Sequence, residues 1–176
     1  RNNKRSAAHH ISSPKRIALL NKVIAETAPD LVHFHHINGF SAAAVSEVRK
    51  SGIPVLFTAT DFWTICSRTS LFVPNKNTVC SGPESPAKCL ACATPNLPHW
   101  VSKAAISMIS EKTAKLSSTT SQIYSTKIRL RDITRHINHA SGIFAATKFQ
   151  ADMITRFGVS SAHLQVVPFG VQLGVL

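Results

Sequence analysis

Short apolar runs alternate with amphipathic segments along most of this chain, and that alternation limits the possible folds more than any other feature. The runs at 31–35, 54–58, 142–146 and 164–167 are rich in apolar residues and lack a clean period of two. Strands of this kind are typical of parallel sheets that are buried on both faces. The sequence therefore predicts an α/β fold with a Rossmann-like parallel sheet and helices on both faces.

Local signals place the helices between these strands. Ser13 followed by Pro14 predicts a helix start, because a hydroxyl N-cap and a proline at the first helical position are both favoured there. Pro29 ends that helix. Further helices are expected over 41–50, 101–109, 130–140 and 147–158, with a Ser/Thr-rich joint at 117–121.

The segment 60–98 interrupts this regularity and contains every cysteine of the chain. A structureless loop of this length is uncommon in a compact domain, so something must order it. Four nearby thiolates match the closed, tetrahedral ligand set of structural zinc. Two disulfides, free buried cysteines and an iron–sulfur cluster are the alternatives. The four cysteines have the spacing C-x13-C-x8-C-x2-C and are Cys66, Cys80, Cys89 and Cys92.

The carboxyl ends of the predicted strands are the expected ligand-binding edge, since ligands bind there in open parallel sheets. His33 and His35 fall two residues apart on one strand and should point to the same side of it. For His35, a role in the cleft competes with an ordinary structural or solvent-facing role. The residues at these strand ends are His35, His36, Asn38 and Gly39, then Thr60 to Trp63, then Thr147, and finally Phe169 and Gly170.

The chain is strongly basic, with 20 Lys and Arg against 8 Asp and Glu and a formal net charge of +12. This charge predicts an anionic partner such as nucleic acid, phospholipid head groups or phosphorylated substrates, unless a more acidic remainder of a longer polypeptide balances it. Nucleic acid is disfavoured, because aromatic residues are sparse and are not interleaved with the basic ones. The sequence lacks an apolar run of about 20 residues and an apolar signal core, so a cytoplasmic location is expected.

Residues 53–66 read Ile-Pro-Val-Leu-Phe-Thr-Ala-Thr-Asp-Phe-Trp-Thr-Ile-Cys. They resemble the segment of family-4 glycosyltransferases in which a strand runs into His-Asp-Tyr-Trp and then a cysteine. The similarity continues through Arg68 and through the cysteine-bearing stretch 80–92, which resembles an insertion of that family in order and spacing. The stretches 29–39 and 140–171 resemble the preceding strand and the approach to the interdomain linker.

This resemblance implies the incomplete N-terminal half of a GT-B enzyme, in which two Rossmann-like domains face a cleft. Residues 1–170 would form the acceptor-side domain, with a Cys-rich insertion at about 64–97, and residues 171–176 would begin the linker. The nucleotide-sugar donor would be bound mainly by a second domain outside this chain. The full-length protein is thus expected to transfer a sugar to a glycan or lipid-linked acceptor, whereas this fragment alone is expected to be inactive.

The resemblance also implies roles for single residues. Asp61 would orient an acceptor hydroxyl or accept its proton, although a loop-bonding Asp is an equally good interpretation. Thr60 stands where many members of the family have His, and it can still donate one hydrogen bond. Trp63 would stack on a sugar or pack in the core. Arg68 would bind the phosphate of a lipid-linked acceptor or face water, and His35, Asn38 and Gly39 would complete the substrate site.

Two other interpretations compete with a transferase. A non-catalytic, zinc-stabilised module that binds an anionic partner such as nucleic acid would also explain the charge and the cysteines. A nucleotide-binding oxidoreductase is disfavoured, since no G-x-G-x-x-G opens a helix. A basic helical stretch is consistent with peripheral docking to anionic lipid at the inner face of the membrane, or with a solvated face. Its members are Lys127, Arg129, Arg131 and Arg135.

Overall fold

A four-stranded parallel sheet forms the centre of the fold in the computed structural model, which describes residues 11–37, 40–73, 76–96 and 98–170. The strand order is β1-β2-β5-β6, and every neighbouring pair is parallel. This confirms the predicted α/β class and parallel sheet. The strands are β1 Val32–Phe34, β2 Val55–Ala59, β5 Gly142–Ala145 and β6 Leu164–Val166.

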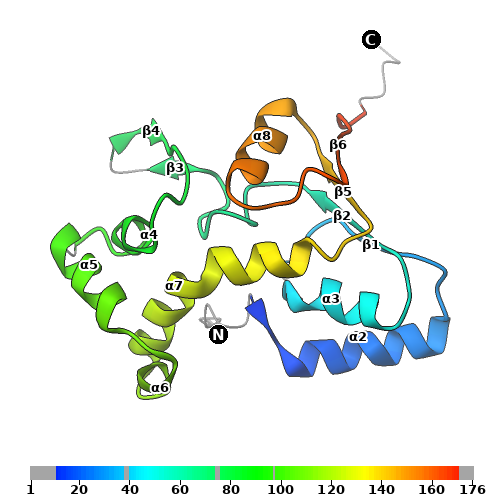
Figure 1. Cartoon of the computed structure of the whole chain (residues 1–176), viewed down its shortest axis with the longest axis horizontal. Helices are drawn as coiled ribbons and strands as arrows, with labels where there is room; N and C mark the ends of the chain where they lie inside the picture. Colours follow the sequence, from blue (N-terminus) through cyan, green and yellow to red (C-terminus); the bar gives the residue numbers. More distant parts are fainter. Residues whose placement is uncertain (1–10, 38–39, 74–75, 97, 171–176) are drawn as a thin grey trace, which may run out of the picture.

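Helices cover both faces of the sheet, as predicted. In Figure 1, α8 (Lys148–Arg156) lies above the sheet, and α2 (Pro14–Thr27) and α3 (Ala43–Lys50) lie below it. The long α7 (Ser118–Ile137) contacts α3 and also the smaller helices beside the sheet. Within the described residues, no helix combines the length and the apolar character that crossing a membrane requires.

The helix α2 begins and ends as its sequence signals predict. Ser13 is the N-cap of α2, and Pro14 is its first residue. The helix stops at Thr27, and Ala28 adopts a left-handed conformation with φ of 42° just before Pro29. The signals act locally, because proline cannot donate a hydrogen bond and restricts the residue before it.

The Ser/Thr-rich stretch at 117–121 starts a helix, so the prediction of a joint there is wrong. The Ser117 side chain accepts a hydrogen bond from the Thr120 backbone, and the Thr120 side chain accepts one from the Ser117 backbone. Hydroxyl groups at these two positions satisfy N–H groups that the first turn leaves unpaired. The helix α7 therefore begins at Ser118, twelve residues before the predicted start at 130.

The segment 60–98 contains more regular structure than the sequence predicted. A short antiparallel hairpin forms within it, followed by a helix that Ser85 caps by accepting from the Lys88 backbone at 3.2 Å. These elements and the next two helices extend beside the sheet in Figure 1. The hairpin strands are β3 Phe72–Val73 and β4 Thr78–Val79, and the helix is α4 Pro86–Ala93. The next two helices are α5 His99–Met108 and α6 Glu111–Ala114.

The core lies where α3, α7 and α8 pack on the sheet. Ile133 and Ile137 of α7, Ile154 of α8 and Val45 of α3 are completely buried. Ile143 of β5 is 1% exposed. Burial of such side chains stabilises each by about 1.5–3 kcal/mol relative to exposure, which anchors the strands whose ends carry the candidate site.

Gly82 lies in the cysteine-bearing segment and packs against Phe157, the residue that follows α8. Its replacement by alanine is expected to destabilise the protein. Its φ is +112°, and a Cβ there would overlap the ring of Phe157. Gly52 provides a matched control, since its φ is +82° but nothing lies within 4 Å of the added carbon. Both changes impose backbone strain of about 1–2 kcal/mol, and overpacking adds about 1–3 kcal/mol at Gly82. Equal urea midpoints for the two variants would contradict the overlap.

His136 makes stability depend on pH. Its Nδ1 lies 2.8 Å from Ser46 Oγ, across the contact of α7 with α3, and burial, then the nearby Arg135, lower the pKa of His136. The folded state therefore resists protonation. The contribution of His136 to stability is fully present above its unfolded pKa of about 6.5, and it is lost as pH falls from that value through the lower pKa of the folded state. Urea midpoints should fall between about pH 7.5 and 5.5, and less steeply in His136→Gln. An unchanged slope in that variant would refute the role.

Candidate functional site

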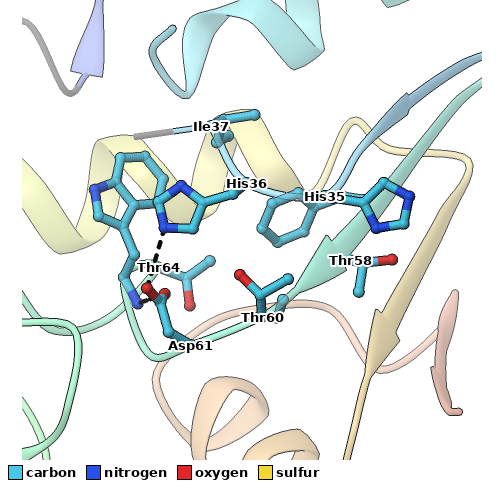
Figure 2. A pocket seen from close by; sticks show the side chains of 10 residues that line it. His35, His36, Ile37, Thr58, Thr60, Asp61 and Thr64 are labelled. Carbon is cyan, nitrogen blue, oxygen red and sulfur yellow. Dashed lines mark hydrogen bonds and ion pairs between the residues drawn. The ribbon is translucent and has the colours of Figure 1, made fainter. Parts of the chain in front are cut away.

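Two neighbouring parallel strands, β1 and β2, place their following turns beside each other. Phe34, the last residue of β1, is paired with Phe57 of β2. Figure 2 shows His36, which follows β1, pointing toward Asp61, which follows β2. Residues of both turns line one small pocket at the predicted ligand-binding edge of the sheet, among them His35, His36, Thr60 and Asp61.

His36 and Asp61 form the central contact of this pocket. His36 Nε2 lies 3.1 Å from Asp61 Oδ2. The other carboxylate oxygen of Asp61 accepts a hydrogen bond from the Trp63 backbone at 2.7 Å, and the Asp61 carbonyl accepts one from Gln150 Nε2 at 3.0 Å. The side chains of His36 and Asp61 are 39% and 31% exposed, respectively. The carboxylate is thus held by the backbone, while the pair stays accessible to a ligand.

His33 of β1 and His35, which follows it, lie side by side. The rings of His33 and His35 are 4.1 Å apart between centroids, which confirms that they point to the same side. His33 Nε2 is 2.8 Å from Thr58 Oγ1. Burial, and secondarily the neighbouring His35, lower the pKa of His33. His33 is therefore a neutral, hydrogen-bonded support beside the pocket that His35 lines.

The other predicted site residues are placed differently. Trp63 lines the same pocket, but it is 4% exposed, and the Arg129 guanidinium carbon lies 5.2 Å from the centroid of its ring. Trp63 therefore packs in the core, and its stacking on a sugar stays a prediction. Arg68 lines a separate cavity. Asn38 and Gly39 lie outside the described residues, as does the predicted linker 171–176.

The separate cavity contains the cysteines. It has a volume of about 560 Å³ and lies between the loop after β2, the β3–β4 hairpin and α4. All four cysteines line it, and all four are free thiols, so the two disulfides that were an alternative to zinc are not formed in this structure. Among the described residues, no three His, Cys, Asp or Glu side chains are placed as a formed metal-ligand set. Zinc binding by these thiols therefore stays a prediction.

The thiols influence one another electrostatically. Burial, followed by the nearby Cys66 and Cys80, raises the pKa of the Cys89 thiol to about 11, although Arg129 acts in the opposite direction. Burial also raises the pKa of Cys92. Metal-free Cys89 is consequently a neutral thiol at physiological pH, and only a strong ligand such as a metal ion would convert it to thiolate.

Arg129 is the most unexpected residue of this region. It is 9% exposed, and its Nη2 donates to the Trp63 carbonyl. Burial lowers its pKa to about 10, whereas Cys66, Cys89 and Asp61 act to raise it. The prediction that Arg129 belongs to a membrane-facing or solvated basic surface is wrong.

Two other residues of the predicted basic surface form hydrogen bonds with separate partners. Lys127 Nζ donates to the Ile109 carbonyl at 2.8 Å, and Arg131 Nε donates to Asp132 at 2.7 Å. The sequence does contain one signal for the burial of Arg129. Ile133 and Ile137, which are buried, follow Arg129 by four and eight residues. Positions four apart share one face of a helix.

In comparisons with known proteins, no family model, no curated protein and no solved structure matches this chain. The fold and the site define the chain only as an α/β protein with a parallel sheet. Its distinguishing site is the His36–Asp61 pair at the carboxyl ends of adjacent strands.

Proposed function

We propose that this chain is the acceptor-binding part of a glycosyltransferase of the GT-B type. The full-length protein would transfer a sugar from a nucleotide-sugar donor to a glycan or lipid-linked acceptor. The observation that supports this most directly is the accessible His36–Asp61 pair at the carboxyl ends of β1 and β2. The sequence resemblance of this same strand and turn to family-4 glycosyltransferases supplies the reaction class.

The pair suits the recognition of a hydroxyl group. A carboxylate that is hydrogen-bonded to an imidazole orients the ring and stabilises its protonated form. Such a pair can bind an acceptor hydroxyl and accept its proton as the hydroxyl attacks the anomeric carbon. Thr60 Oγ1 lies in the same pocket and offers one further donor or acceptor.

Transfer also requires a donor site, which this proposal assigns mainly to a second domain outside the chain. Placing the acceptor hydroxyl against the anomeric carbon contributes to catalysis only when donor and acceptor are held together. The present chain is therefore expected to bind acceptor but not to catalyse transfer by itself.

Two measurements test the proposal. The full-length protein is incubated with a panel of nucleotide sugars, and release of nucleoside diphosphate should rise when glycan or lipid-linked acceptors are added. The 176-residue chain is titrated with the same acceptors, and the NMR signals of the His36 ring should shift in a saturable manner. Absence of both acceptor-dependent release and His36 shifts would reject the proposal.

A further inference from the structure

Arg129 is a buried cation that lacks an anion in contact. It is 9% exposed and forms no ion pair with a carboxylate of the described residues. Its Nη1 is buried and has no hydrogen-bond partner in the described part of the chain. An uncompensated buried charge is strongly destabilising, so a nearby negative charge is expected in the functional protein.

Two thiols are close enough to supply that charge. The helix α7, which carries Arg129, packs against α4, which carries Cys89, and Cys66, Cys89 and Asp61 all act on the charge of Arg129. Cys66 and Cys89 also line the cavity that Cys80 and Cys92 complete. Thiols acquire negative charge when they coordinate a metal ion, because the ligand is the deprotonated form.

We propose that the four cysteines bind one divalent zinc ion as thiolates and that Arg129 balances the charge of this centre. Four thiolates around a divalent ion leave two net negative charges, and a buried guanidinium offsets one of them. Four sulfur ligands also match the preference of zinc for soft donors. This proposal goes beyond the acceptor site and does not depend on it.

Binding requires the thiols to move toward one another, since no three of the described ligand-type side chains form a ready metal site. The cavity of about 560 Å³ leaves room for that movement, and the segments that carry the thiols are short elements beside the sheet. Closure on the ion would cross-link the loop after β2, the end of the hairpin and α4, which carry the four cysteines.

The charge balance would also tie the metal centre to the acceptor site. Arg129 Nη2 holds the Trp63 carbonyl, and the Trp63 backbone in turn donates to the Asp61 carboxylate at 2.7 Å. Arg129 is thus a positioning residue between the thiols and the turn that presents Asp61. Metal loading is expected to fix this turn.

The test titrates the 176-residue chain with zinc(II) and with cobalt(II), without donor or acceptor. The unaltered chain should bind one ion, and the cobalt absorption bands should report four sulfur ligands. Arg129→Gln keeps a donor for the Trp63 carbonyl but removes the charge, and it should weaken zinc affinity about 10–100-fold. Arg129→Lys keeps the charge and should restore most of that affinity.

Arg131→Gln is the matched control, because Arg131 lies on the same helix and its side chain is 72% exposed. The Arg131→Gln variant should bind zinc as the unaltered chain does.

The proposal is overturned if the unaltered chain shows no sulfur-ligated cobalt, or if Arg129→Gln binds zinc with full affinity. Equal weakening by Gln and Lys would assign Arg129 a packing role only. If both variants fail to fold, the cobalt spectrum of the unaltered chain decides the metal assignment, and Cys66→Ser should then lose one sulfur ligand. All of these measurements are made without donor or acceptor, so a failure of the metal proposal is distinguishable from a failure of the acceptor assay.

Discussion

Replacing Asp61 with asparagine is expected to lower kcat/KM for the proposed acceptor-dependent sugar transfer by the full-length protein about 10²–10⁴-fold. Asparagine retains the size of the side chain and an oxygen that can accept from the Trp63 backbone, a hydrogen bond of 2.7 Å in the structure. It loses the negative charge that faces His36 at 3.1 Å. The variant should therefore fold normally and bind acceptor while failing to promote proton transfer from the acceptor hydroxyl.

Asp152→Asn is the control for this experiment. Asp152 lies on α8, has a side chain that is 61% exposed and pairs with Lys148, away from the His36 pocket. Its variant should transfer sugar at the rate of the unaltered protein. A full transfer rate in Asp61→Asn, with folding verified by circular dichroism, would remove Asp61 from the mechanism.

Truncating Leu20 to alanine is expected to reduce the free energy of unfolding by about 2–5 kcal/mol. Leu20 is 9% exposed and belongs to the core, so the change deletes buried atoms and leaves a cavity. The adjacent Leu19 is 59% exposed on the same helix. Leu19→Ala makes the same change in helix propensity and should alter stability by less than about 0.5 kcal/mol.

Urea denaturation of the two leucine variants, followed by far-ultraviolet circular dichroism, measures this difference. The slope of the transition should be the same in both variants, since the surface exposed on unfolding is nearly equal. Similar losses for Leu19→Ala and Leu20→Ala would show that α2 does not pack on the core through Leu20.

Much of the architecture could be predicted because its signals are local. Apolar runs of strand length marked β1, β2, β5 and β6, and proline marked the limits of α2. The error at 117–121 arose because Ser and Thr favour both loops and helix N-termini, and only the reciprocal bonds of Ser117 and Thr120 separate the two. The hairpin and α4 were missed because cysteine, proline and glycine obscure periodicity in a short element.

The candidate site could be predicted only in part. Parallel strands end at one edge, so the neighbourhood of His35, Thr60 and Asp61 followed from the order of elements. The sequence did not identify His36 as the residue that contacts Asp61, since that depends on how the turn after β1 bends toward the turn after β2. Trp63 illustrates the reverse case, because its burial under Arg129 is visible only after α7 packs on that turn.

The sequence by itself determined the alternation of helices and strands, the parallel sheet and the clustering of four cysteines in one segment, since each follows from neighbouring residues. The tertiary structure alone decided the environment of each polar group. Arg129 shows the physical reason: a basic residue on a helix is ordinarily solvated, and its charge becomes an unbalanced buried charge only when α7, the Trp63 turn and the cysteine cavity enclose it.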